Sequence, residues 1–218
     1  VVLESSSADP QAAFRFKMEL YTGDFPETRR TNRWAIDGTV FEWAGARYFA
    51  WSGWADHRDE QWLYIAAMEN PWTLRGPRRR LCANDDYVWE RVGESAKQRG
   101  LNEAPQALMH EGRLFLIYSC SGSWQRTYKL GMLTLRAGGD PLNAKDWTKS
   151  PTPVFQSTET LFGVGHCSFT TSPDLRERWI LFHAKKERSE GWRRSIFAQP
   201  FEWSPKGEPL FGNEKQLP

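Results

Sequence analysis

The feature that most constrains the fold of this chain is an internal repeat of about 64 residues. Each repeat starts with a polar residue that precedes a β-like segment, and we call Asp37, Glu103 and His166 the anchor residues. Glu103 follows Asp37 by 66 residues, and His166 follows Glu103 by 63. Unrelated turn caps have no reason to recur in register. We therefore expect the anchor residues to occupy equivalent places in three structural units.

The same order of strand-like segments follows each anchor residue. A short strand and a turn lead to a strongly apolar strand, and a polar loop then leads to a third strand. The apolar strands are rich in the aromatic and β-branched residues that β-structure favours, and they cover residues 48–51, 114–118 and 179–183. A segment with Pro or Trp closes each unit, at residues 71–72, 141–147 and 200–203.

Units of this size with three or four antiparallel strands are typical of β-propeller blades. The sequence predicts an all-β fold in one domain over residues 1–218, with blades at 32–98, 99–160 and 161–210. The opening residues resemble the end of a unit and are expected to supply a strand of a preceding blade. Three blades do not close a ring, so we expect further N-terminal blades or a second chain to complete it. Blade faces left exposed should make residues 1–218 self-associate.

Charge and composition exclude some classes of partner. Lys and Arg number 29 against 27 Asp and Glu, so the chain has no general attraction to nucleic acid or to an anionic membrane. The basic run at residues 78–80 is expected on a loop, and Glu90, Asp85 and Asp86 are expected to be solvated loop charges. No apolar run approaches the roughly 18 residues of a membrane span. We expect neither a nucleic acid nor a membrane as partner.

The aromatic content points to a carbohydrate or to a β-rich core. The chain has 12 Trp, 13 Phe and 6 Tyr although its mean hydropathy is −0.66. Trp54 and Trp124 both follow a second strand and are expected on loops, where an indole either stacks on a sugar ring or packs between blades.

The anchor residues are expected to converge, because the innermost strand of each propeller blade starts near one mouth of the central channel. Two carboxylates in a confined site push their pKa values apart, so that one stays protonated as an acid. Glycoside hydrolysis uses such a pair on either side of the scissile bond. Considered singly, Asp37 and Glu103 are instead typical turn caps, and His166 is a typical buried histidine bonded to the backbone.

Four motifs in order then resemble glycoside hydrolase family 43, and most closely its α-L-arabinofuranosidase-type branch. They are AIDGTVF at residues 35–41, NEAPQ at 102–106, GVGHCSF at 163–169 and AQPF at 198–201. The resemblance covers almost the whole chain. It implies a five-bladed propeller and an inverting hydrolase that removes α-L-arabinofuranosyl residues from plant cell-wall polysaccharide, outside the cell.

The resemblance also implies roles for individual residues. Glu103 would be the general acid, and Asp37 would orient it and tune its pKa. His166 would lie at the channel axis, where family members often hold a calcium ion through water. His183 matches a family position near the site, with a structural role as the alternative. Arg194, in a basic pair with Arg193, either stays on the surface or points into the site to hold a carboxylate or the substrate.

The chain departs from the family pattern at its N-terminal side. The aspartate that serves as general base on the first blade, and a Trp-Ala-Pro-Glu-type motif on the second, are not found in the sequence. Roughly 100 residues of a five-bladed ring are unaccounted for, so residues 1–218 alone are expected to be inactive. The alternatives are a non-catalytic carbohydrate-binding propeller fragment, and a β-xylosidase or arabinanase of the same family.

Overall fold

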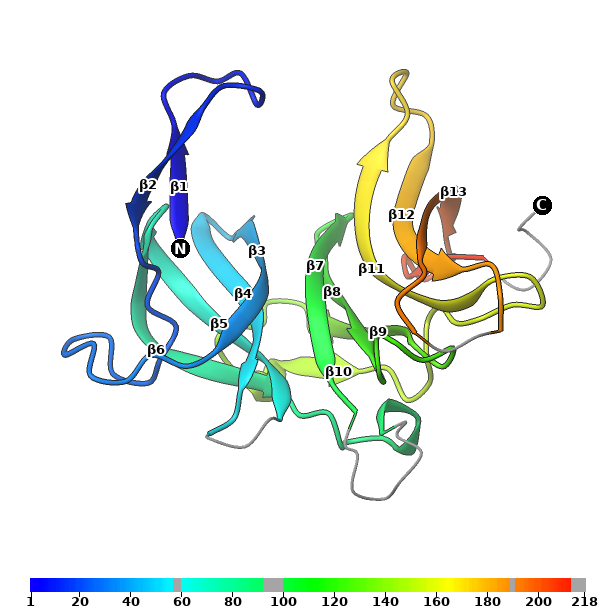
Figure 1. Ribbon diagram of the computed structural model, residues 1–218, viewed down its shortest axis with the longest axis horizontal. Coiled ribbons are helices and arrows are strands. Elements are labelled where there is room, and N and C mark those ends of the chain that lie inside the picture. Colours follow the sequence, from blue (N-terminus) through cyan, green and yellow to red (C-terminus); the bar gives the residue numbers. More distant parts are fainter. Residues whose placement is uncertain (57–59, 92–99, 189–190, 213–218) are drawn as a thin grey trace.

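The computed structural model describes residues 1–56, 60–91, 100–188 and 191–212, and these form an all-β fold of propeller type (Figure 1). A first sheet has the order β3-β4-β5-β6, a second β10-β9-β8-β7 and a third β11-β12-β13-β14. The strands of the first sheet are β3 (Ala35–Trp43), β4 (Ala46–Trp54), β5 (Gln61–Asn70) and β6 (Thr73–Cys82). Those of the second are β7 (Asn102–His110), β8 (Arg113–Cys120), β9 (Lys129–Leu135) and β10 (Trp147–Lys149). Those of the third are β11 (Phe162–Thr171), β12 (Arg178–Lys185), β13 (Ser195–Trp203) and β14 (Pro209–Leu210).

Two short elements and one hairpin complete the described chain. The 3₁₀ turns η1 (Val88–Glu90) and η2 (Ala144–Asp146) lie in connections, and β1 (Val2–Ser5) pairs with β2 (Phe14–Met18). The N-terminal residues therefore supply two paired strands, whereas the sequence suggested one. No helix among the described residues is long and apolar enough to cross a membrane.

Tight turns join the first two strands of the first and second sheets, as the sequence predicted. Ala44 and Gly45 have φ of 50° and 77°, and Glu111 and Gly112 have φ of 46° and 72°. Two successive left-handed residues match the right-handed twist of the flanking strands, which is the geometry of a two-residue hairpin.

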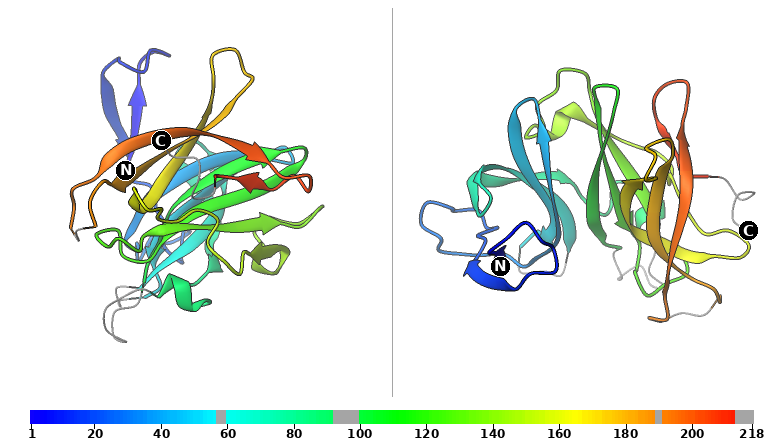
Figure 2. Two further views of the ribbon diagram at one scale, coloured as in Figure 1. Left: turned by 90° about the vertical axis from the view of Figure 1, so that its right-hand side faces the viewer. Right: turned by 90° about the horizontal axis from the view of Figure 1, so that it is seen from above.

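The middle sheet is buried on both faces, which explains the unbroken apolar run in β8. Successive side chains of a strand point to opposite faces, so Leu114, Leu116 and Tyr118 pack against the first sheet. Phe115 and Ile117 pack against the third sheet. The sheets therefore stack face to face like neighbouring blades, with the inner strands β3, β7 and β11 side by side (Figure 2).

Two sequence expectations about these sheets are wrong. Residues 200–203 do not close the third unit but lie within β13, which pairs with β12 over residues 195–201 and with β14 at residues 202 and 203. The basic run at residues 78–80 belongs to strand β6 and not to a loop. Arg78 is buried there, and its guanidinium contacts Asp24 at 2.6 Å and lies over the ring of Tyr64. Its charge is used inside the fold.

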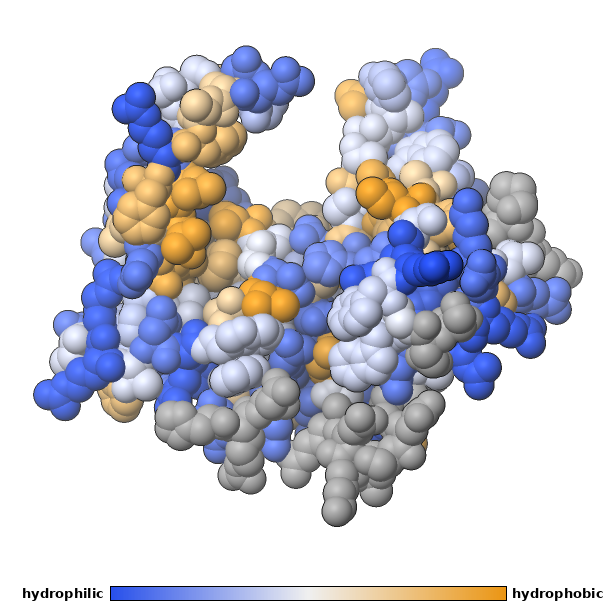
Figure 3. All heavy atoms as spheres, in the orientation of Figure 1, coloured by the Kyte–Doolittle hydropathy of each residue, from blue (hydrophilic) through white to orange (hydrophobic). Residues whose placement is uncertain are grey.

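The hairpin β1–β2 leaves apolar side chains exposed. Leu3, Phe14 and Phe16 are 54%, 53% and 64% exposed. The surface is hollowed between this hairpin and the third sheet, and apolar surface follows the side of the hollow that β1 and β2 form (Figure 3).

Candidate active site

A β-bulge interrupts each inner strand at its start. The pairing register shifts between Ile36 and Thr39 in β3, between Glu103 and Gln106 in β7, and between Gly165 and Ser168 in β11. Within the bulges, Asp37, Ala104 and His166 have φ of 55°, 50° and 51°. A left-handed conformation is uncommon outside glycine, so its recurrence shows that these three residues are structurally equivalent.

The register of the anchor residues is therefore offset by one in the second sheet. Ala104 and not Glu103 is the equivalent of Asp37 and His166, and Glu103 is the residue before the left-handed one. The sequence repeat could not show this, because the spacings of 66 and 63 residues hide a shift of one position. A bulge turns neighbouring side chains in new directions, so both Asp37 and Glu103 still face the same site.

Asp37 is linked to the neighbouring strands on both sides. The backbone N–H of Ala104 donates to its carboxylate, and Nε2 of His166 lies 4.0 Å from Oδ1. Burial raises the pKa of Asp37, while the charge of His166 and the Ala104 N–H oppose this increase. The carboxylate thus joins β3 to β7 and β11.

Glu103 is 7% exposed and is bonded by one aromatic residue, Tyr128. The hydroxyl of Tyr128 donates a hydrogen bond of 2.6 Å to its Oε1. Burial raises the pKa of Glu103 to about 7, and the negative charge of Asp37 acts in the same direction to a smaller extent. The Tyr128 hydrogen bond and the charge of Arg194 lower it. The expected role of Asp37 as a charge that raises this pKa is therefore secondary to burial.

Tyr128 is fully buried, and it was not among the site residues predicted from the sequence. Its ring lies against Gly165, where a Cβ would overlap it, and it stacks on His183 with ring centroids 5.4 Å apart. Ser119 accepts the backbone N–H of His166 at 2.7 Å and also bonds Tyr128. No sequence signal marks Tyr128, because a tyrosine before an apolar strand is ordinary core material.

His183 and Arg194 lie at the same end of the sheets as the carboxylates. Nη1 of Arg194 is 2.9 Å from Nε2 of His183, and the nitrogen of His183 accepts because a guanidinium can only donate. Burial, followed by the charges of Arg194 and His166, lowers the pKa of His183 to about 4. The neutral His183 accepts a hydrogen bond from Arg194 and so helps to hold this cation. The charge of Arg194 in turn acts on the pKa of Glu103.

Of the two tryptophans that were expected on loops, only Trp124 lies on one. Trp54 is the last residue of β4 and not a loop residue, and its ring stacks on Trp34 with centroids 5.3 Å apart. Trp124 does lie on a loop, is 38% exposed, and has the ring of Trp192 at 6.1 Å. Each indole thus contacts another indole, and both remain partly accessible at the end of the sheets where Asp37 and Glu103 lie.

A buried charge network supports the start of β7. Glu90 was expected to be a solvated loop charge, but it is 0% exposed. It accepts hydrogen bonds from Tyr118 at 3.0 Å and from Asn102 at 3.2 Å, and Lys149 lies 2.7 Å away. Because Asn102 directly precedes Glu103, this network fixes the backbone that carries the buried carboxyl.

The described residues do not form a direct calcium cage. Calcium takes six to eight oxygen ligands, whereas no group of three or more His, Cys, Asp or Glu side chains is arranged for a metal in the described part of the chain. An ion near His166 would have to be held largely through water, as the sequence resemblance implies. This calcium ion stays a prediction.

Comparisons with known proteins identify the family of this chain. The model of the family described as "Glycosyl hydrolases family 43" matches residues 2–209. The extracellular exo-alpha-(1->5)-L-arabinofuranosidase of Streptomyces chartreusis is 37% identical over 189 residues, which cover 85% of this chain and 53% of that protein. A protein of the same name from Streptomyces avermitilis is 33% identical over 224 residues, which cover 97% and 43%.

A solved structure shows the same arrangement of strands. The crystal structure of alpha-L-arabinofuranosidase from Lactobacillus brevis matches with a TM-score of 0.81 and 32% identity, covering 96% of this chain and 64% of that one. The chain spans about half the length of the curated relatives that it matches.

Proposed function

The chain belongs to glycosyl hydrolase family 43, and on that premise we propose that it carries the general-acid side of an inverting, exo-acting α-L-arabinofuranosidase site. The observation that carries the proposal is Glu103, a buried carboxyl with a pKa of about 7 that is hydrogen-bonded by Tyr128. A general acid works best when its pKa lies near the working pH. With this pKa, a substantial fraction of Glu103 would be protonated near neutral pH and could give its proton to the departing glycosidic oxygen.

The neighbouring residues would each have a distinct part in this step. Asp37 raises the pKa of Glu103 and, through the Ala104 N–H, holds the strand that bears it. Arg194, together with the indoles of Trp54 and Trp124, would contact the sugar, whose C–H faces pack well on flat apolar rings. His183 would keep Arg194 oriented, because the two side chains are hydrogen-bonded.

The general base that activates water would come from an additional blade, which would complete a five-bladed ring together with residues 1–218. In an inverting enzyme the two carboxyl groups are about 6.5–9.5 Å apart, to leave room for the attacking water. The substrate class is an arabinose-containing oligo- or polysaccharide, and the relatives named extracellular support action outside the cell. Under this proposal, residues 1–218 bind carbohydrate but do not hydrolyse it alone.

The test uses residues 1–218 extended by the N-terminal part of an active relative. Glu103→Gln should lose activity on arabino-oligosaccharides by about 10²-fold or more. It should lose far less on aryl arabinofuranosides, whose leaving group departs without a proton. The matched control is Glu42→Gln, an exposed residue on the same inner strand as Asp37. Equal losses on both substrates, or hydrolysis by residues 1–218 alone, would refute the assignment.

A second variant tests the role of Asp37. Asp37→Asn removes a negative charge that raises the pKa of Glu103, so the pKa of the acid should fall. The basic limb of the pH–rate profile, which the general acid controls, should then move to lower pH, together with a lower maximal rate. An unchanged limb would assign Asp37 to a purely structural role.

A further inference from the structure

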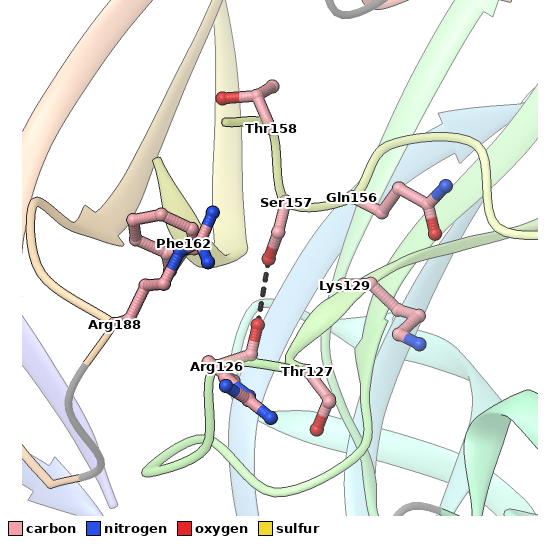
Figure 4. Close-up of a pocket in the computed structure, with 8 residues that line it drawn as sticks. All are labelled: Arg126, Thr127, Lys129, Gln156, Ser157, Thr158, Phe162 and Arg188. Carbon is pink, nitrogen blue, oxygen red and sulfur yellow. Dashed lines mark hydrogen bonds between the residues drawn. The ribbon is translucent and has the colours of Figure 1, made fainter. Parts of the chain in front are cut away.

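A separate pocket lies where the second and third sheets meet. It has a volume of about 310 Å³ and is lined by Arg126, Thr127, Lys129, Gln156, Ser157, Thr158, Phe162 and Arg188 (Figure 4). The lining comes from the β8–β9 and β10–β11 connections, from the first residues of β9 and β11, and from the β12–β13 connection. None of the residues assigned to the candidate active site lines it.

The pocket is strongly basic in a chain of nearly balanced charge. Three of its eight lining side chains, those of Arg126, Lys129 and Arg188, are cationic and none is acidic. The whole chain has 29 basic and 27 acidic residues, so chance alone would give similar numbers of each. Such a local excess of one charge attracts a ligand of the opposite sign.

Lys129 is the cation whose surroundings point most clearly to a ligand. It is half-buried, and no carboxylate of the described residues acts on its pKa. Burial lowers the pKa of Lys129, as expected for a partly desolvated ammonium. A partly desolvated ammonium gains most from an anion that it can bond directly.

The wall of the pocket is held in place before any ligand binds. The hydroxyl of Ser157 donates to the carbonyl oxygen of Arg126 at 2.7 Å and accepts the backbone N–H of Gly163 at 2.9 Å. Figure 4 shows Phe162 and Arg188 on one side of the Arg126–Ser157 hydrogen bond, with Lys129 and Gln156 on the other. A ligand would therefore not have to order these connections, which reduces the cost of binding.

The lining suits a sugar acid better than a bare inorganic anion. Small-molecule sites start at about 300 Å³, and this pocket has room for a ring as well as an anionic group. The ring of Phe162 is buried, and the guanidinium of Arg188 lies over it at 5.3 Å, so the ring holds this cation at the pocket. The amide of Gln156 and the hydroxyl of Thr158 offer partners for sugar hydroxyls.

We propose that this pocket binds the carboxylate of a uronic acid residue in the polysaccharide from which the chain's active site removes arabinofuranosyl units. The proposal rests on the proposed function, since it assigns a second, charged sugar of the same substrate. The two sites are adjacent in the chain: Tyr128 bonds Glu103, and its neighbours Thr127 and Lys129 line the pocket. The pocket therefore selects acidic regions of the polysaccharide.

The test is a calorimetric or NMR titration of residues 1–218 with methyl glucuronoside, methyl glucoside and inorganic phosphate. The uronoside should bind, more weakly as salt is added, and the neutral glucoside should not. Lys129→Met and Arg188→Met should each weaken uronoside binding about tenfold, as expected for the loss of one charge-assisted contact. The control Arg79→Met removes an exposed arginine from the first sheet and should leave binding unchanged.

The titration measures binding and not hydrolysis. Its result therefore tests the uronic-acid proposal independently of the proposed function. Equal binding of glucoside and uronoside would refute charge recognition. Phosphate binding as tight as uronoside binding would show a general anion site and overturn the sugar-acid assignment. Uronoside binding that survives both Lys129→Met and Arg188→Met in variants with unchanged circular dichroism would place the site elsewhere.

Discussion

The hydroxyl of Tyr128 donates to Oε1 of Glu103 across 2.6 Å, where Tyr128 is fully buried and Glu103 is 7% exposed. This hydrogen bond stabilises the ionised carboxylate, whereas burial and Asp37 stabilise the neutral acid. The pKa of about 7 is therefore a balance. Removing a single contact should move it in a direction that can be stated in advance.

Tyr128→Phe should raise the pKa of Glu103 by about 1, since one hydrogen bond to a charged group is lost. Gly165→Ala should act in the same direction, because a Cβ at position 165 would displace the Tyr128 ring. The carboxyl ¹³C shift of Glu103 reports its titration directly. Tyr48→Phe, a buried tyrosine of the first sheet, is the control. A lower pKa in Tyr128→Phe would contradict the account.

Arg194→Met should raise the pKa of His183 above its value of about 4, because a neighbouring positive charge is removed. The same substitution should raise the pKa of Glu103, which Arg194 lowers. Imidazole NMR signals followed against pH would measure the first change. Arg193→Met removes an exposed charge next to it in the chain and should leave His183 unchanged. A pKa of His183 that stays near 4 in Arg194→Met would show that the charge of Arg194 does not contribute to the shift.

Lys149→Met should destabilise the fold by about 3–5 kcal/mol, since it leaves the carboxylate of Glu90 buried without its cation. The double variant Glu90→Gln, Lys149→Met should recover part of this loss because no buried charge remains. Urea unfolding gives both free energies. Lys145→Met, an exposed lysine on η2, should change the free energy of unfolding by less than about 0.5 kcal/mol.

Residues 1–218 should self-associate through the exposed apolar side chains of β1 and β2. Leu3→Ser and Phe16→Ser together should shift light-scattering masses toward the monomer, because the apolar area that drives association is lost. Leu210→Ser, which removes a similarly exposed leucine from β14, should have little effect. A monodisperse monomer of the unsubstituted chain would show that this surface does not drive association.

The repeating strand pattern was readable from the sequence because it depends on neighbours along the chain. Turn residues and apolar runs predicted the first two hairpins and the strongly apolar strand β8, and the four motifs predicted the family. Asp37, Glu103 and His166 were also identified from their recurrence before apolar strands. Such features can be read from the sequence because they depend on local patterns: a strand and its hairpin partner are only a few residues apart.

What the tertiary structure decided are the contacts that cross between sheets. The one-residue offset of Glu103, the hydrogen bond from Tyr128 and the burial of Glu90 against Lys149 all depend on how bulged strands and connections of different blades meet. The basic pocket likewise draws its residues from separate connections. Such contacts carry no periodic signal, because their partners lie tens of residues apart and meet only once the blades have stacked. The sequence by itself therefore determined the blades and the candidate acid, and the packing between blades decided the pKa of that acid and the surroundings in which it acts.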